Sequence, residues 1–403
     1  MEAAKKKRMA LAEQLYDETA RCIVSGCSAD EAVLRSAFQE ERTLWDNSSV
    51  WADLQRRSRA ASVDALGVKA VPLPDRVFRV VESREDLLLF PTPDSLYTVR
   101  TSGTTDAANR GVGHIDAVAA PVHMLSLLAA WLLVVRDLGH DSFCSKMEFP
   151  TYRETIQSFV RPGGPYLVPT ALQEKPFSAF ISLFPDPENA ESLPEFDSSG
   201  MVIAYHATQM GRSMADETFH AVIPGPLVSG RRIPPFAPDW EHWARIASNR
   251  NGKPIAAFMP TPTHIALYEK IKAGELPPLS EGDLIVSGGG SKGRTLHPVE
   301  GAESIAGFAV NGLGSTLDGG AFWGKPLRST DVLSSPDWTH HRDAPLVMNL
   351  AYGAEEGVVE GDTQGARLVV DPVMGLCRPG LHWYPGDTVR RCSDGIYFAE
   401  REI

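Results

Sequence analysis

Residues 384–401 read YPGDTVRRCSDGIYFAER, a stretch in which two turn signals interrupt a strand-forming run. Gly-Asp and Asp-Gly pairs suit turns, and the Val, Ile, Tyr and Phe around them favour strands, so the stretch predicts a β-hairpin. The carboxylate of Asp387 can accept hydrogen bonds from two neighbouring donors, because its two oxygens lie side by side. The alternative is a surface hairpin on which Asp387 is a turn residue and binds nothing.

Short apolar runs precede this hairpin and alternate with helix-like segments. We expect strands at residues 97–100, 201–204, 255–258, 284–287 and 308–310, amphipathic helices within about residues 3–60, and a buried helix over residues 117–138. Strands interleaved with helices indicate an α/β fold with largely parallel sheets. The predicted division is an N-terminal helical segment packed on the main domain (1–80), an α/β core (81–345) and a β-rich subdomain (346–403).

Composition limits the classes of partner. The net charge is −12, which disfavours nucleic acid because phosphate backbones require clustered Lys and Arg. No apolar run reaches the roughly 18 residues that cross a membrane, and the most apolar stretch, residues 124–135, indicates a buried helix. The cysteines are Cys22, Cys27, Cys144, Cys377 and Cys392, and they show no metal-ligand spacing. Their scatter predicts a reducing, cytoplasmic location.

A hydroxyl-rich loop follows the first of these predicted strands, ahead of the predicted helix. Thr101-Ser-Gly-Thr-Thr105 has four hydroxyls and one glycine in five residues. Gly103 lets the backbone approach an anion, and the amides and hydroxyls can donate hydrogen bonds to phosphate oxygens. The loop therefore predicts a phosphate site, with a polar turn that caps the helix as the alternative.

Taken in order, these segments resemble the adenylate-forming enzymes, which include acyl-CoA synthetases, peptide-synthetase adenylation domains and luciferases. Residues 101–105 match the start of their phosphate loop, T-S-G-T-T-G-x-P-K-G-V, and Arg110-Gly-Val112 aligns with its Lys-Gly-Val after one insertion. Residues 284–290 (LIVSGGG) resemble their adenine-binding strand and glycine turn, and residues 311–317 (NGLGSTL) resemble N-x-Y-G-x-T-E. Residues 384–401 resemble Y-x-T-G-D-x-x-R followed by the hinge, so the resemblance extends over about residues 87–401.

The resemblance implies a fold and a reaction. The fold is the large N-terminal domain of the family, with stacked αβαβα layers and a distorted β-barrel subdomain, and with the small C-terminal domain absent. The reaction is ATP- and Mg²⁺-dependent activation of a carboxylic acid, aromatic and from a natural-product pathway, as an acyl-adenylate. The chain is also similar to the naturally short members of phenazine antibiotic biosynthesis. A pathway reductase or transferase is the expected partner, and a homodimer is compatible with the sequence.

The resemblance also assigns roles to individual residues. Phosphate binding and catalysis fall to Thr101, Ser102, Gly103, Thr104, Thr105 and Arg110. Nucleotide binding falls to Gly288, Gly289, Gly290, Asn311, Gly312, Leu313, Gly314, Ser315, Thr316, Asp387 and Arg401. The acid pocket is expected at His206, which follows a predicted strand, and at Pro260 and His264, and Asp318 is the candidate magnesium ligand.

Departures from the family pattern leave other interpretations open. Asp106 stands at a glycine position, Leu313 replaces the tyrosine that stacks on adenine, and Leu317 replaces the glutamate that holds magnesium. A homologue that binds nucleotide or aryl acid with little catalysis is therefore the second interpretation. The third is acyl transfer through Cys392, because flanking arginines can lower a thiol pKa. A dinucleotide oxidoreductase is disfavoured because no G-x-G-x-x-G follows the first strands.

Overall fold

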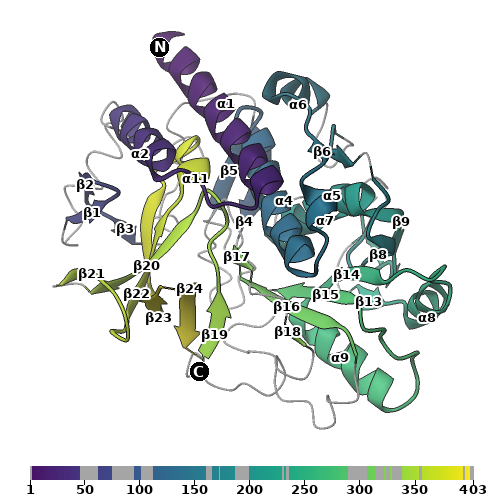
Figure 1. Ribbon diagram of the computed structural model, residues 1–403. Coiled ribbons are helices and arrows are strands. Elements are labelled where there is room, and N and C mark those ends of the chain that lie inside the picture. Colours follow the sequence, from purple (N-terminus) through teal and green to yellow (C-terminus); the bar gives the residue numbers. More distant parts are fainter. Residues whose placement is uncertain are drawn as a thin grey trace.

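The computed structural model describes residues 2–45, 62–74, 95–100, 112–159, 166–171, 173–186, 199–228, 231–232, 236–288, 306–313, 322–323, 327–328, 338–353, 356–393 and 395–399. These residues contain two seven-stranded sheets, and helices pack on the first sheet and between the sheets (Figure 1). The predicted α/β architecture with parallel strands is confirmed.

The first sheet is largely parallel. Its strand order is β17-β16-β15-β14-β8-β9, with β18 also paired to β16. The strands are β8 (Phe177–Ser182), β9 (Ala215–His220), β14 (Ile255–Met259), β15 (Leu284–Gly288), β16 (Phe308–Leu313), β17 (Phe322–Trp323) and β18 (Leu327–Arg328). Strands β9, β8, β14, β15 and β16 run parallel, whereas β17 and β18 are antiparallel to β16.

Helices cover both faces of this sheet. Side chains alternate along β15, so Leu284 and Val286 join one hydrophobic cluster while Ile285 joins another. The first cluster includes residues of α4 (Ala120–Asp137) and α7 (Ser199–Met214), and the second includes residues of α8 (Trp240–Ser248) and α9 (Thr261–Lys272). Burial on both faces explains why these strands are continuous apolar runs.

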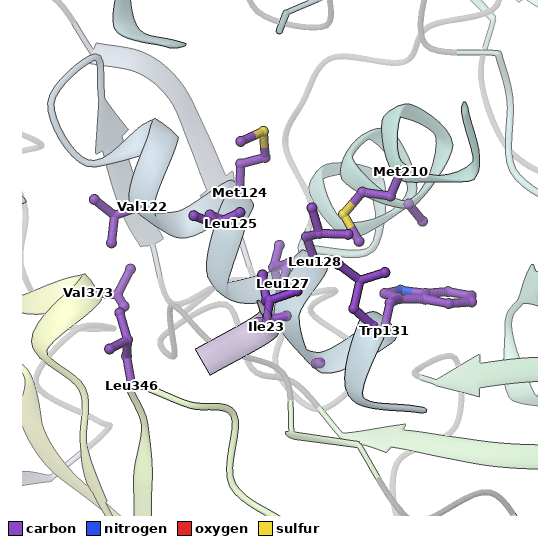
Figure 2. Packing of buried hydrophobic residues seen from close by; sticks show 14 of the residues in the cluster. Ile23, Val122, Met124, Leu125, Leu127, Leu128, Trp131, Met210, Leu346 and Val373 are labelled. Atoms are coloured by element: carbon purple, nitrogen blue, oxygen red, sulfur yellow. The ribbon is translucent and has the colours of Figure 1, made fainter. Parts of the chain in front are cut away.

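Helix α4 is buried almost all round (Figure 2). Val122, Leu125 and Leu128 are fully buried, and α4 packs against α1 (Glu2–Ser25), α5 (Asp141–Cys144), α6 (Tyr152–Ser158) and α7. Among the described residues, α4 is the one helix with the length and composition of a membrane span, yet 83% of it is buried inside the protein. The prediction that residues 124–135 form a buried helix is confirmed.

A buried ion pair ties α1 to the start of α4. Arg8 Nη2 lies 2.6 Å from Asp116 Oδ2, and both side chains are buried. The other oxygen of Asp116 accepts hydrogen bonds from the backbone amides of Val118 and Ala119, both at 3.0 Å. One carboxylate therefore fixes the N-terminal helix and the first turn of α4 together.

The second sheet is largely antiparallel. Its order is β19-β24-β23-β22-β20-β21, and β3 (Leu73–Pro74) pairs in parallel with β23. The strands are β19 (Trp338–His341), β20 (Met348–Gly353), β21 (Gly357–Val359), β22 (Gly365–Val370), β23 (Leu381–Cys392) and β24 (Gly395–Ala399), with α11 (Pro372–Gly375) between β22 and β23. Strands β23 and β24 form the predicted hairpin, which is confirmed.

Shorter elements complete the described part of the chain. Helix α2 (Glu31–Trp45) packs on α1 and α11, so two N-terminal helices are confirmed. The short strands pair as β1 (Val63–Ala65) with β2 (Val68–Ala70), β4 (Ser95–Arg100) with β5 (Val112–Asp116), β6 (Met147–Glu148) with β7 (Thr170–Ala171), β10 (Val222–Ile223) with β13 (Ala237–Pro238), and β11 (Leu227–Val228) with β12 (Arg231–Arg232).

Two sequence predictions are wrong. The apolar run at residues 201–204 lies in helix α7 and is not a strand, because a short apolar run suits a buried helix equally well. The hydroxyl-rich loop does not lead directly into a helix either. Residues 101–111 link the antiparallel strands β4 and β5, and α4 begins only after β5.

A buried carboxyl group lies between α2 and the segment after α11. Glu41 is fully buried, and its Oε1 accepts a hydrogen bond from the backbone amide of Gly380 at 2.6 Å. Gly375 lies so close to Glu41 that a Cβ there would collide with the carboxyl group. Burial raises the pKa of Glu41 well above its ordinary value, and Asp371 raises it further. The Gly380 hydrogen bond and Arg42 oppose this shift, and the net result is that the folded protein holds the Glu41 proton more tightly than the unfolded chain does.

We expect the contribution of Glu41 to the free energy of unfolding to decline as pH rises above about 4.3, the ordinary pKa of glutamate. Below that pH both states hold the proton; above it the unfolded chain releases a proton that the folded state retains. Glu41→Gln should remove this decline and make the protein more stable than the parent at about pH 8 in urea denaturation. Glu31→Gln on the exposed face of the same helix is the control and should follow the parent. A Glu41→Gln variant less stable than the parent at alkaline pH would mean that Glu41 is charged in the fold.

Candidate functional site

Two of the predicted nucleotide-binding segments, which include Gly288 and Gly312, meet at the carboxyl edge of the parallel sheet. Strands β15 and β16 pair in register so that Ser287 lies opposite Asn311, and Gly288 lies opposite Gly312. Pro260 follows β14 at the same edge, since Met259 pairs with Ser287. Ligands of open α/β sheets bind outside the carboxyl ends of the strands. Two glycine-bearing strand ends side by side leave a flat backbone surface there.

Asp387 lies in strand β23 and is not a turn residue. The register between β22 and β23 shifts at this point, because Arg367 pairs with Tyr384 whereas Ala366 pairs with Thr388. Residues 385–387 are therefore a bulge, a feature that re-aims side chains. The side chain of Asp387 is only 9% exposed, so the surface-hairpin alternative is wrong for this residue.

Asp387 belongs to a buried polar network that the sequence did not reveal. Arg367 Nη1 lies 3.8 Å from Asp387 Oδ2, and the guanidinium also stacks over the Tyr384 ring, 4.8 Å from its centroid. Arg367 Nε donates to Asn349 Oδ1 at 2.8 Å. The buried guanidinium of Arg367 therefore helps to fix the Asp387 carboxylate. The sequence does not indicate this pair, because Arg367 is a strand residue that belongs to no motif.

Asp343 continues the network toward the hairpin. It accepts hydrogen bonds from the backbone and side-chain nitrogens of Asn349 at 3.0 and 2.9 Å, and it pairs with Arg391 Nη1 at 2.7 Å. Burial raises the pKa of Asp343, while Arg391 and Asn349 oppose that shift. The ion pairs of Arg367 with Asp387 and of Arg391 with Asp343 therefore hold together the strands around Asp387.

His206 lies in α7, within an aromatic cluster on the α4 side of the sheet. Its Nδ1 is 2.8 Å from the hydroxyl of Tyr166, and its ring meets His123 edge-on with centroids 5.4 Å apart. Tyr166 stacks on Phe159 at 4.6 Å. Burial lowers the pKa of His206 well below its ordinary value, and His123 lowers it further, so the ring is neutral. Helix α7 also contacts β4, the strand that leads into residues 101–105.

His264 lies on the opposite face of the sheet. It is in the first turns of α9, and its Nδ1 is 2.8 Å from Ser287 Oγ. Burial lowers its pKa to about 3, so it too is neutral. Because α7 and α9 belong to different hydrophobic clusters, the structure does not bring His206 and His264 into one pocket.

Other predicted residues lie outside the described part of the chain: Thr101, Ser102, Gly103, Thr104, Thr105, Arg110, Gly289, Gly290, Gly314, Ser315, Thr316, Asp318 and Arg401. For Asn311, Gly312 and Leu313 the structure describes the backbone of β16. Within the described ranges there is no group of three His, Cys, Asp or Glu residues that could hold a metal ion.

No known family profile and no curated protein matches the sequence. Solved structures resemble it weakly. The N-terminal subdomain of Klebsiella oxytoca NpsA in complex with 3-hydroxyanthranilyl-AMSN is 11% identical, with a TM-score of 0.39 over 75% of this chain and 61% of that one. ATP-bound MatB from Rhodopseudomonas palustris is 12% identical, with a TM-score of 0.40 over 75% and 47%. The amide bond synthetase McbA from Marinactinospora thermotolerans is 14% identical, with a TM-score of 0.31 over 56% and 41%.

The matched region spans less than two thirds of each of these three proteins. Likeness at such identities and TM-scores concerns general shape alone.

Two carboxylates allow a matched test of the network around Asp387. Asp387→Ala should lower the free energy of unfolding by about 1–3 kcal/mol, because it leaves a buried guanidinium short of a partner. Asp362 lies at the same 3.8 Å from Arg390 Nη1, but it is 97% exposed. Asp362→Ala should therefore change stability by less than about 0.5 kcal/mol in the same urea denaturation. Equal effects of the two substitutions would show that Asp387 is not part of a buried network.

Proposed function

We propose that this chain is an adenylate-forming enzyme, which binds ATP and activates a carboxylic acid as an acyl-adenylate. The observation that carries the proposal is the pairing of Gly288 with Gly312 at the carboxyl edge of the parallel sheet. Two segments that resemble the family's adenine-binding motifs, and that are separated in sequence, are neighbours there. A side chain at either glycine would meet the face of a purine, so their flat backbone suits adenine.

Asp387 is the proposed ribose ligand. Its carboxylate is held by Arg367 in a bulge of β23, and a carboxylate fixed in this way suits two adjacent hydroxyls. An ionised carboxylate only accepts hydrogen bonds, and the two neighbouring ribose hydroxyls of a nucleoside can donate them. Magnesium enters the proposal through the sequence resemblance, with Asp318 as the candidate ligand, and the ion would neutralise the departing pyrophosphate.

The chemistry requires two anions to approach each other. A carboxylate oxygen of the acid attacks the α-phosphorus of ATP, the bond from that phosphorus to the bridging oxygen breaks, and pyrophosphate leaves. Catalysis is then mainly positioning and charge neutralisation. Residues 101–105 and Arg110 are the proposed donors to the β- and γ-phosphates, with Arg401 near the ribose.

The acid is proposed to be aromatic and to lie on the α7 face of the sheet. That face holds His206 among Tyr166, Tyr205 and Phe159, and Tyr166 and Tyr205 meet edge-on at 5.3 Å. Aromatic side chains favour stacked and edge-on contacts with a flat ring. His264, on the α9 face, is then a structural residue, because its Nδ1 is bonded to Ser287.

Two finer proposals concern context. A reductase or transferase of an antibiotic pathway of the phenazine kind is the proposed acceptor of the acyl group, and the cytoplasm is the proposed location. Acyl transfer through Cys392 is not favoured, because the arginines beside it are engaged elsewhere. Arg390 pairs with Asp362 and Arg391 with Asp343, and Cys392 Sγ faces the carbonyl of Gly361 at 3.7 Å.

The test is acid-dependent release of pyrophosphate from ATP by the full chain, with a panel of aryl acids. Arg110→Ala should slow this release by about 10²–10³-fold, the usual cost of one donor to developing charge. It should leave the affinity for AMP nearly unchanged, because AMP lacks the β- and γ-phosphates. Arg110→Lys, which keeps the charge, is the matched control and should retain most of the rate.

Two outcomes would contradict the proposal. Binding of ATP and AMP in calorimetry without any acid-dependent pyrophosphate would favour the second candidate, a nucleotide-binding homologue with little catalysis, which the leucines at positions 313 and 317 support. Failure to bind either nucleotide would remove the adenylate-forming proposal, and failure to bind any aryl acid as well would remove the second candidate.

A further inference from the structure

A buried histidine and a buried serine link helix α9 to the end of strand β15. His264 Nδ1 lies 2.8 Å from Ser287 Oγ, and neither residue is exposed to solvent. Ser287 is followed directly by Gly288, which pairs with Gly312 in the surface proposed for adenine. The contact therefore lies one residue before the proposed nucleotide site.

The same contact joins the ends of two neighbouring strands. Ser287 of β15 pairs with Met259, the last residue of β14. Helix α9 begins directly after β14, and the backbone amides of Thr263 and His264 donate to the carbonyl of Pro260 at 3.0 and 3.1 Å. The side-chain contact thus ties the junction between β14 and α9 to the end of the next strand in the sheet.

Packing alone does not account for a histidine at this position. Burial lowers the pKa of His264 to about 3, so the ring carries no charge. Its Nε2 is screened from water and has no hydrogen-bond partner among the residues that the structure describes. A buried nitrogen without a partner costs free energy, and an apolar side chain could fill the same space without that cost. What the histidine adds is the hydrogen bond to Ser287.

The end of β15 is a place where such an anchor has an effect. Gly288 is the last residue of the strand, and a glycine has more backbone freedom than any other residue and no side chain to pack. The bond from Ser287 Oγ to a buried ring restricts the serine side chain and, with it, the peptide that leads into Gly288. The ring of His264 is itself oriented by Tyr268, whose ring centroid lies 4.5 Å away.

We propose that His264 is a positioning residue for the nucleotide. Through Ser287 it holds the backbone of Gly288 in the place that the adenine ring requires, and it does not touch the ligand itself. The inference rests on the proposed function and deepens it. Because ATP and AMP share the adenine, loss of the contact should weaken both equally and should leave the chemical step unchanged.

The experiment compares His264→Gln with His264→Asn in calorimetric titrations of the full chain with AMP. The amide of asparagine can take the place of Nδ1 and keep the contact with Ser287, whereas the amide of glutamine extends beyond it. His264→Gln should weaken AMP binding about tenfold, the upper end for one neutral hydrogen bond, and His264→Asn should recover most of that loss. Ser287→Ala should match His264→Gln, and the double variant should be no weaker than either, because both changes remove the same contact.

Leu267→Ala is the control for loss of packing. Leu267 is fully buried in the same helix and belongs to the hydrophobic cluster on that face of the sheet. It should lower the free energy of unfolding in urea at least as much as His264→Gln does, yet bind AMP as the parent does. In pyrophosphate release His264→Gln should raise the KM for ATP about tenfold and retain kcat, as expected for lost uniform binding. A variant that is only destabilised would instead lose kcat at an unchanged KM.

The outcomes separate this inference from the proposed function. AMP binding by the parent, with the same affinity in His264→Gln and Ser287→Ala, would overturn the positioning role and leave the proposed function standing. An equal loss of affinity in Leu267→Ala would overturn it too, since any weakening of α9 would then suffice. If the parent bound neither AMP nor ATP, the proposed function would fail and this inference with it.

Discussion

Burial of α4 is the constraint on which the rest of the fold depends. A helix that is apolar on every side has no stable position in water, so other elements must surround it. Here α1, α6 and α7 pack on α4, and α11 brings Val373 of the second half of the chain against it (Figure 2). Trp131 of α4 also meets Phe180 and Phe258 of the parallel sheet edge-on. The position of the parallel sheet, and hence of its carboxyl edge, follows from that packing.

Polar groups fix this apolar assembly in one arrangement. Asp116 pairs with Arg8 of α1 and accepts hydrogen bonds from the backbone amides at the start of α4. These directional bonds fix the position of α1 on α4. A similar device serves the second sheet, where Arg367 joins Asn349, Tyr384 and Asp387. Breaking a buried pair is costly because the remaining charge stays in a medium of low polarity. The ribose ligand proposed here is thus also a structural residue.

The fold could be predicted where short apolar runs mark strands that are buried on both faces. The apolar runs at residues 255–258, 284–287 and 308–310 are strands, because residues buried on both faces leave an unbroken apolar signal. The same signal failed at residues 201–204, since a helix packed against α4 and β8 can also contain an unbroken run of four apolar residues. A pattern of four apolar residues is too short to distinguish a buried strand from a buried helix.

The candidate site could be predicted only as a set of separate motifs. Order along the chain indicated which segments belong together, and the sheet register then placed Gly288 beside Gly312. Sequence gave no way to tell that His206 and His264 fall on opposite faces, because the face depends on where each helix crosses the sheet. The partners of Asp387 were also hidden, since Asn349 and Arg367 are distant in sequence and fit no motif.

The reaction path is tested most directly by following oxygen from the acid. The full chain would be given ATP and an aryl acid labelled with ¹⁸O in its carboxylate, with hydroxylamine as acceptor, and the products would be analysed by mass spectrometry. Because a carboxylate oxygen forms the bond to the α-phosphorus and stays there when hydroxylamine attacks the carbonyl, AMP should carry one ¹⁸O, and pyrophosphate none. Label in inorganic phosphate with ADP as the second product would mean attack at the γ-phosphorus, and would contradict adenylate formation.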